Sequence, residues 1–346
     1  MTIDKNYELI ARGVDVQDAQ IIKHKLDNGD LVKGFWGTAP TGKPHIGYLL
    51  PCIKLMEFVA AGVETCVYFA DTYAFLINHD VSAERVGYRT RYYQFLLSAI
   101  LDSLGVPKSK VSFVTESERF TYDPAFISKE HQLCVLVSQD AIRACGNEID
   151  ETNALSPMMC PGRQALAEAF LGVHFQLGGE DQRGMFNFAN TFLPQLGFDK
   201  AAHLINPLLP ALSGAKMSSS KAASSKIEFL DTADDVTSKI LTCHFDEENV
   251  DSNGLLAIAK MVIFPFTRIA NSTGKPWEFS CELADGRNKE YISYEELVRD
   301  LKEGTVGAKC IKVAVASTLN RLLEPIRQAF ASSKEWQEIA DLAYPS

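Results

Sequence analysis

Two kinds of hydrophobic pattern alternate along the first part of the chain. Short runs rich in β-branched and aromatic residues predict strands at 32–36, 64–70, 111–115 and 173–177. Longer segments with helical spacing predict helices at 44–61, 83–104 and 182–196. Ser82 is a suitable N-cap for the second of these helices, and Gly105 and Pro107 follow its end. The alternation predicts an α/β fold with a parallel sheet covered by helices.

Beyond residue 226 the pattern becomes helical. Helices are predicted at 231–241, 255–262, 293–301 and 311–330, which together indicate a compact helical domain. Residues 116–151 interrupt the earlier alternation and carry an apolar strip at 134–137. Pro207, Pro210 and Gly214 mark the joint between the two parts.

Composition and charge narrow the possible functions. The chain has 346 residues, 46% of them hydrophobic, which is enough for a large core. No apolar run in residues 1–18 resembles a signal or a membrane span, so a soluble, cytoplasmic protein is expected. The eight cysteines form no CxxC pair, which argues against a zinc ribbon.

The distribution of charge bears on a nucleic-acid partner. The net charge is −10, and residues 227–346 hold 13 Lys and Arg against 20 Asp and Glu. An acidic domain is unfavourable for binding phosphate backbones, although a local basic patch remains compatible with this total.

Two short motifs carry candidate chemistry. Residues 40–47 place a Gly-rich turn before His45 at the start of a helix, where backbone N–H groups favour phosphate. Residues 216–220 place Lys216 and three serines on a loop that follows Gly214. Together they predict ATP binding. Residues 37–43 also fit the first seven positions of a Walker A loop, but Pro44 stands where a magnesium-binding hydroxyl belongs.

The two motifs, in this order, resemble the HIGH and KMSKS signatures of class I aminoacyl-tRNA synthetases. Further segments resemble the eukaryotic and archaeal tyrosyl-tRNA synthetases over about residues 30–330: 35–38, 69–71, 178–183, 206–207 and 322–327. The resemblance implies a Rossmann-like doubly wound parallel sheet followed by an all-helical C-terminal domain. The implied division is a helical extension at 1–32, a catalytic domain at 33–226 and an anticodon-binding-like domain at 227–346. The catalytic domain would include a dimer-forming insertion at about 116–160 and a KMSSS loop at 213–221.

The resemblance also implies roles for individual residues. The catalytic residues would be His45, Lys216 and Thr41. The ATP-binding residues would be Gly37, Gly42, His45, Gly47, Asp181, Lys216, Met217, Ser218 and Ser219. The amino-acid-binding residues would be Phe35, Gly37, Tyr68, Tyr73, Cys160, Gln164, Ala167 and Gln182. Mg²⁺ is expected to arrive with ATP, and no protein metal site is expected.

Several positions depart from the pattern of the tyrosyl family. Phe35 stands where the family has Tyr and Ala167 where it has Asp, so both partners of a phenol hydroxyl are missing. Burying that hydroxyl unpaired would cost about 1 to 3 kcal/mol. Cys160, Tyr73 and Tyr68 also replace other residue types, and either tyrosine is an alternative partner for the substrate. The anticodon-reading motif and a Lys-Lys pair near the acceptor stem are likewise replaced, at 307–310 and 143–146.

The leading hypothesis is a homodimeric ligase that forms aminoacyl-AMP from ATP and an amino acid and charges tRNA, as tyrosyl-type enzymes do. One alternative is a paralogue that activates a different aromatic or apolar amino acid and transfers it to an acceptor other than tRNA. A second alternative is a catalytically silent regulatory paralogue.

Overall fold

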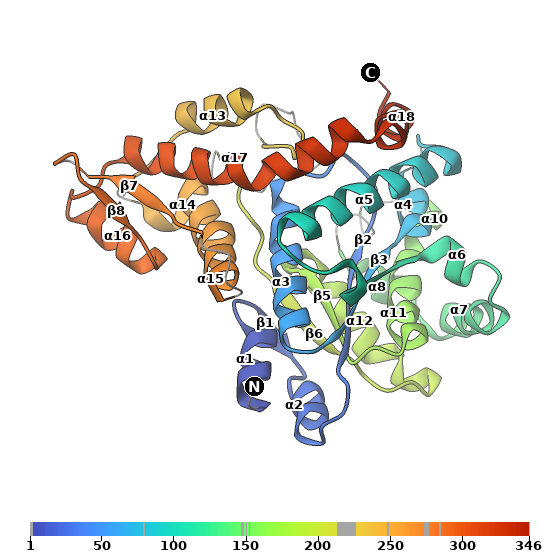
Figure 1. The fold of residues 1–346 in the computed structure, drawn as a ribbon. Coiled ribbons are helices and arrows are strands. Elements are labelled where there is room, and N and C mark those ends of the chain that lie inside the picture. The colour runs from blue at the N-terminus through green and yellow to red at the C-terminus, as the bar shows by residue number, and fades with distance from the viewer. Residues whose placement is uncertain are drawn as a thin grey trace.

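The computed structural model describes residues 3–78, 80–146, 149, 151, 153–212, 226–247, 249–272, 277–283 and 285–345. At its centre lies a six-stranded sheet in the order β1-β6-β5-β2-β3-β4 (Figure 1). Its strands are β1 (Asp15–Gln17), β2 (Lys33–Thr38), β3 (Glu64–Phe69), β4 (Val111–Thr115), β5 (Phe175–Gly179) and β6 (Ala202–Asn206). Strands β2 to β6 run parallel, as predicted, and β1 adds an antiparallel edge to β6.

The sheet changes its winding direction at β2. On β2, Phe35 pairs with Cys66 of β3 on one side and with Gln176 of β5 on the other. The chain moves outward from β2 through β3 and β4, then returns to the opposite side of β2 for β5 and β6. The loops that follow β2 and β5 therefore diverge and leave a crevice at the carboxyl edge, where ligands of doubly wound sheets bind.

Helices cover both faces of the sheet. The main ones are α3 (Leu49–Ala60), α4 (Asp71–Ile77), α5 (Ala83–Ser103), α11 (Cys160–Leu171) and α12 (Arg183–Phe192). Trp36 and Val67 belong to one hydrophobic cluster with α3 and α5. Phe35 and Tyr68, one position away along each strand, belong to a second cluster with α11 and α12. This alternation follows from the period of two in a strand and places Phe35 and Tyr68 on the same face.

The insertion between β4 and β5 is helical. Its helices are α6 (Glu116–Phe120), α7 (Pro124–Leu136), α8 (Gln139–Arg143) and α10 (Leu155–Met158). In the strip predicted to be apolar, Val135 is 90% exposed and Leu136 is 40% exposed. Short helical turns complete this half of the molecule: η1 (Ile46–Tyr48), η2 (Lys108–Lys110), η3 (Glu180–Gln182) and η4 (Pro194–Leu196).

The C-terminal part is mainly helical. It contains α13 (Ala233–Thr242), η6 (Val250–Ser252), α14 (Gly254–Ile258), a π-helical turn (Ala259–Ile263), α15 (Phe264–Ser272), α16 (Tyr294–Lys302), α17 (Ala308–Ser332) and α18 (Lys334–Ala343). It also contains a hairpin, β7 (Ser280–Glu282) and β8 (Asn288–Glu290), which an all-helical prediction omits. These strands are three residues long and mostly exposed, so they leave no hydrophobic alternation to detect.

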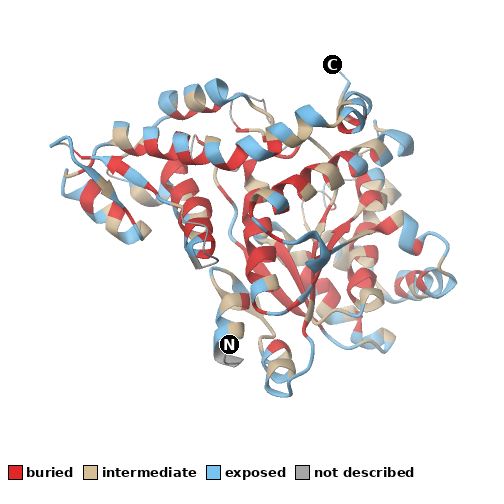
Figure 2. Ribbon diagram, in the orientation of Figure 1, coloured by how far each residue is buried: buried red, intermediate tan, exposed pale blue. Residues whose placement is uncertain are grey.

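Helix α17 joins the two halves. It packs on α13 and on α5, and its inner face is buried while its outer face is exposed (Figure 2). The Ser103 hydroxyl at the end of α5 donates a hydrogen bond of 2.8 Å to the Leu322 carbonyl oxygen. Residues 254–271 are apolar and long enough to cross a membrane by composition, but 67% of that window is buried inside the fold.

The N-terminal segment closes over α3. It contains α1 (Ile3–Ala11) and α2 (Gln20–Asp27) in addition to β1. The buried Lys54 ammonium donates to the carbonyl oxygens of Leu9, Ile10 and Arg12 and to the Glu57 carboxylate, at 2.7 to 3.0 Å. Because burial opposes the charge, the pKa of Lys54 is lowered. These contacts make α1 part of the core.

Candidate active site

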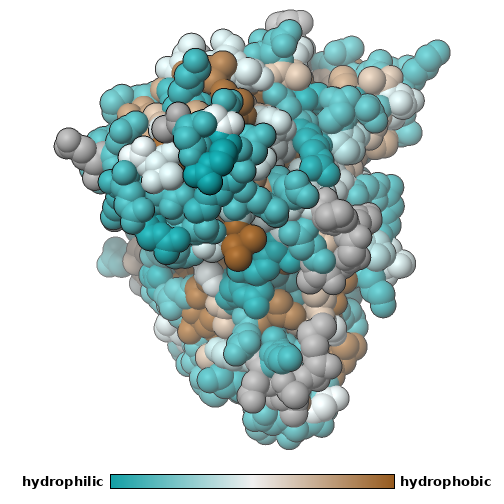
Figure 3. All heavy atoms as spheres, turned by 60° about the vertical axis from the view of Figure 1, so that its left-hand side comes forward, coloured by the Kyte–Doolittle hydropathy of each residue, from teal (hydrophilic) through white to brown (hydrophobic). Residues whose placement is uncertain are grey.

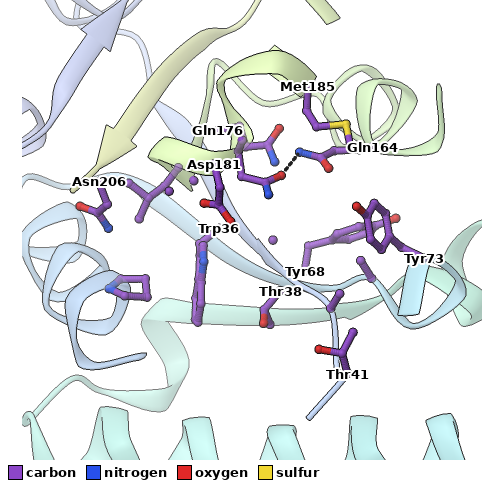
Figure 4. Close-up of a pocket in the computed structure, with 18 of the residues that line it drawn as sticks. Trp36, Thr38, Thr41, Tyr68, Tyr73, Gln164, Gln176, Asp181, Met185 and Asn206 are labelled. Carbon is purple, nitrogen blue, oxygen red and sulfur yellow. Dashed lines mark hydrogen bonds between the residues drawn. The ribbon is translucent and has the colours of Figure 1, made fainter. Parts of the chain in front are cut away.

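A cavity of about 640 Å³ opens at the crevice between the ends of β2 and β5. Most of the residues proposed from the sequence lie on its wall: Phe35, Gly37, Thr41, His45, Gly47, Tyr68, Tyr73, Gln164, Ala167, Asp181 and Gln182. Figure 4 labels some of them. Gly42 and Cys160 are not on the wall. The Cys160 thiol is buried and points to the Ser156 carbonyl oxygen, 4.0 Å away.

The predicted Lys216, Met217, Ser218 and Ser219 lie outside the described residues. The chain on either side of them approaches the cavity. Leu208 and Leu209, which precede them, line it. Ile227 and Glu228, which follow them, pair with the backbone of Ile46 and His45.

His45 is held as a neutral hydrogen-bond donor. It precedes η1 in an extended conformation, and its Nδ1 accepts the Gly47 N–H at 3.1 Å. Burial and the nearby Lys226 ammonium lower the pKa of His45 to about 4. A neutral imidazole that accepts at Nδ1 carries its proton on Nε2. The side chain that reaches the cavity wall is therefore an uncharged N–H donor.

Gly47 makes this arrangement possible. A Cβ atom at position 47 would lie 2.7 Å from Cε1 and 2.8 Å from Nδ1 of His45. Both distances are shorter than a Cβ contact allows, so a larger residue would displace the imidazole. The glycine of the motif is thus required by the packing of the histidine.

The turn between β2 and His45 is fixed from outside the sheet. The Gly42 carbonyl oxygen accepts hydrogen bonds from Tyr93 at 2.7 Å and from Tyr344 at 2.9 Å. Arg89 donates to the Thr41 carbonyl oxygen. Gly37 and Thr38 belong to β2, so residues 37–43 do not form a continuous Walker A loop.

Two carboxamides mark the other side of the cavity. Gln164 of α11 donates through Nε2 to Oε1 of Gln182, 3.1 Å away (Figure 4). Asp181 precedes Gln182 at the carboxyl end of β5, at the edge where the crevice opens. Amide oxygens and a carboxylate are suitable acceptors for an ammonium group and for ribose hydroxyls.

The deep end of the cavity combines aromatic rings with a buried ion pair. Phe35 and Tyr68 make an edge-to-face contact with centroids 5.8 Å apart. Arg163 bonds Glu116 at 2.6 Å and Glu130 at 2.9 Å, and both Arg163 and Glu116 reach the wall. Burial raises the pKa of Glu116 in spite of this pairing.

Sequence reasoning gave no role to several residues of this site. Trp36, Tyr48, Gln176 and Asn206 line the cavity, and Lys226 lies beside His45. Asn206 ends β6 at the same carboxyl edge, and Gln176 is the one polar side chain in β5; both are signals that the sequence contained. The sequence around Lys226 contains no pattern that links it to His45.

The fold and the site define a class of protein: a doubly wound α/β domain with a cavity at its switch point and a buried histidine that precedes a helix on the cavity wall. The model of the class I tRNA synthetases for W and Y matches residues 28–324, and the chain belongs to this family. Within the family the similarity is to tyrosine--tRNA ligases, and this resemblance, the class I ligase assignment and the fold class are confirmed.

The chain is 40% identical to the cytoplasmic tyrosine--tRNA ligase of Saccharomyces cerevisiae, over 99% of this chain and 89% of the relative. It is 38% identical to the cytoplasmic tyrosine--tRNA ligase of Gallus gallus, over 91% of this chain but only 58% of that longer protein. Among solved structures, the tyrosyl-tRNA synthetase of Archaeoglobus fulgidus complexed with L-tyrosine has a TM-score of 0.85 at 30% identity, covering 95% and 99% of the two chains. The enzyme of Aeropyrum pernix has the same TM-score at 26% identity, covering 99% and 98%.

Proposed function

We propose that this protein activates an α-amino acid with ATP and transfers it to tRNA, as a tyrosyl-type aminoacyl-tRNA synthetase. The observation that carries the proposal is that the neutral His45 and the Gln164–Gln182 pair line one cavity at the switch point of the sheet. One side is suited to phosphate and the other to an ammonium group. ATP and the amino acid, the two substrates of amino-acid activation, would therefore bind in one crevice.

In the activation step, a carboxylate oxygen of the amino acid attacks the α-phosphorus of ATP. The bond to the pyrophosphate oxygen breaks, and aminoacyl-AMP and pyrophosphate are formed. Mg²⁺ enters as MgATP, bound to the phosphates as part of the substrate. His45 would donate its Nε2 proton in a hydrogen bond to a phosphate oxygen as negative charge develops there. As a donor that remains neutral, it binds the transition state without taking or giving a proton.

The other roles follow from position. Asp181 would accept hydrogen bonds from the ribose hydroxyls, and Gln164 and Gln182 would accept from the ammonium group of the amino acid. Lys216 would add a positive charge at the pyrophosphate, with Met217, Ser218 and Ser219 on the same loop. The pairing of Ile227 and Glu228 with the His45 segment supports this role, because these two residues follow Lys216 by about a dozen positions and are held beside His45.

The acceptor in this proposal is tRNA. The relatives are named as tRNA ligases, whereas the comparisons give no support to a non-tRNA acceptor or to a silent paralogue.

The surface offers polar groups to such a partner. Figure 3 shows that the face turned forward is mostly hydrophilic, with small apolar areas. With 20 acidic against 13 basic residues in 227–346, phosphate contacts there would depend on local basic groups.

The proposed assembly is a cytoplasmic homodimer. The relatives' names place those proteins in the cytoplasm. The outer face of α7 exposes Val135 and Leu136, and this apolar surface is suited to contact with a second copy.

ATP–pyrophosphate exchange across the twenty amino acids, followed by transfer to total tRNA, tests the proposal. Exchange with at least one amino acid and charging of tRNA are expected. His45→Ala and Lys216→Ala should each lower exchange by about 10² or more, whereas His244→Ala, outside the cavity wall, should not. Full exchange in the His45 variant would contradict its role, and exchange without charging would contradict the tRNA step.

A further inference from the structure

The Tyr68 side chain places a polar atom in the apolar end of the cavity. Tyr68 lies on β3, is 3% exposed and contributes to the cavity wall. Its hydroxyl is buried and has no hydrogen-bond partner among the residues that the structure describes. A buried hydroxyl without a partner is unfavourable, so a bound molecule that supplies one gains affinity at this point.

The neighbouring side chains define what such a molecule meets. A Cβ atom at Gly37 would lie 3.5 Å from Phe35, 3.7 Å from Nε2 of Gln176 and 3.8 Å from the Tyr68 ring. The absent Cβ thus leaves space between these three side chains, which come from three adjacent strands. Oε1 of Gln176 is also buried and lacks a partner in the described part of the chain. Two residues that each carry a buried oxygen without a described partner therefore flank the space beside Gly37.

Phe35 and Ala167 provide no hydrogen-bonding group on the β2 and α11 sides of this space. The polar atoms come instead from β3 and β5, which flank β2. In the proposed function, on which this inference rests, Gln164 and Gln182 hold the ammonium group of the amino acid. Its side chain would then extend toward the ring of Tyr68 (Figure 4).

Charge limits the kind of substituent that fits. Arg163 is already paired with Glu116 and Glu130, so these three groups offer no uncompensated cation to an anionic substrate. The pKa of Tyr68 is raised well above its ordinary value, by burial and by the Glu116 carboxylate. The Tyr68 hydroxyl stays protonated at neutral pH and can both donate and accept. A neutral hydroxyl or amine on the substrate matches these properties.

We propose that Tyr68 is the specificity-determining residue of the amino-acid pocket, and that its hydroxyl hydrogen-bonds a neutral polar substituent on the ring of an aromatic amino acid. A hydroxyl in the para position and one in the meta position have the same chemistry, and comparison of tyrosine with meta-tyrosine distinguishes the two.

The test compares kcat/KM for ATP–pyrophosphate exchange with tyrosine, meta-tyrosine and phenylalanine in the unchanged protein and in Tyr68→Phe. The unchanged protein should prefer one hydroxylated amino acid over phenylalanine by about tenfold or more. Tyr68→Phe should lower this preference at least about fivefold, while phenylalanine itself changes less than about twofold. The preferred isomer shows where on the ring the substituent lies.

Thermal unfolding without ligands provides an independent readout. Since Tyr68→Phe removes an unpaired buried hydroxyl and keeps the ring, it should leave the melting temperature unchanged or raise it. A lower melting temperature with an equal loss of exchange for all three amino acids would indicate a structural role and overturn the proposal. An unchanged preference in Tyr68→Phe would overturn it as well.

The exposed Tyr122→Phe is the matched control and should behave as the unchanged protein does. Failure of the proposed function gives a different result, because the unchanged protein would then exchange with no amino acid. Absence of exchange with every amino acid would contradict the proposed function, and with it the role of Tyr68.

Discussion

The Tyr344 hydroxyl donates a hydrogen bond to the Gly42 carbonyl oxygen, 2.9 Å away and 302 residues earlier in the chain. Arg89 links the same two segments, since it donates to the carbonyl oxygens of both Thr41 and Ala343. The last helix, α18, packs on α5 and brings Tyr344 to this place. The turn that precedes His45 is thus positioned by the end of the helical domain.

Tyr344→Phe should weaken ATP binding. The variant removes one of the two tyrosine hydrogen bonds to the Gly42 carbonyl oxygen and keeps the ring. The free energy that holds the turn in place should therefore fall by about 0.5 to 1.5 kcal/mol. KM for ATP should rise about two- to tenfold while kcat changes little. Exchange kinetics with varied ATP measure this, with Tyr122→Phe as the exposed control. A fall in kcat at constant KM would argue against a positioning role.

Gly47→Ala should inactivate the enzyme nearly as strongly as His45→Ala. The new Cβ would overlap the imidazole and break the Nδ1 contact that fixes its proton on Nε2. Gly87→Ala is the matched control, because a Cβ atom added to that helical glycine would have no neighbour within 4 Å in the described part of the chain. The control should be neutral or more stable by up to about 1 kcal/mol. Equal exchange rates in the two alanine variants would refute the packing argument.

His45 should make the folded protein less stable in mild acid. Its pKa is about 4 in the folded chain against an ordinary value of 6.5, so between these values the unfolded chain binds a proton that the folded chain does not. Stability should therefore fall as the pH drops from 6.5 toward 4, by up to about 3 kcal/mol. Above pH 6.5 the contribution of His45 should be constant.

Urea unfolding at a series of pH values measures this effect against His45→Asn, which cannot titrate and keeps an acceptor for the Gly47 N–H. The difference in unfolding free energy between the two proteins should change between pH 6.5 and about 4. A difference independent of pH would show that the pKa of His45 is not lowered.

Arg163→Met should destabilise the fold strongly. It leaves the buried Glu116 and Glu130 carboxylates without their shared cation, and breaking a buried pair in this way costs about 3 to 5 kcal/mol. The matched control is Arg183→Met, whose ion pairs with Asp15 and Glu180 are exposed. Urea denaturation should show a far smaller change for the control. Similar losses in both variants would mean that burial is not the deciding factor.

Local sequence patterns predicted several elements of the half that holds the six-stranded sheet. The strand at 111–115 matches β4, the strand at 64–70 matches β3 within one residue, and Ser82 caps α5 through the Arg85 N–H as expected. These signals are strong because they depend on neighbours in the sequence. The predicted strand at 173–177 is displaced to 175–179, since hydrophobicity alone does not mark where pairing with β2 begins.

Long-range contacts were beyond prediction. The antiparallel β1 is three residues long and becomes a strand only through β6. Nothing near Lys226 points to His45, and nothing near Tyr344 points to Gly42, since both pairs are created by packing of distant segments. Likewise, the sequence showed that Tyr68 is an unusual residue for a tyrosyl-tRNA synthetase at this position. Only the structure shows that its hydroxyl is buried without a described partner.

The contacts of Lys54 have a practical consequence for any shortened version of this chain. Three of its four hydrogen-bond acceptors are peptide carbonyls from the first dozen residues. Trimming those residues would remove these three acceptors, leave Glu57 as the remaining acceptor, and uncover the part of α3 that they bury. A truncation made to improve crystals or expression would thus destabilise the half of the molecule that holds the six-stranded sheet, although it removes only the first short helix and the residue after it.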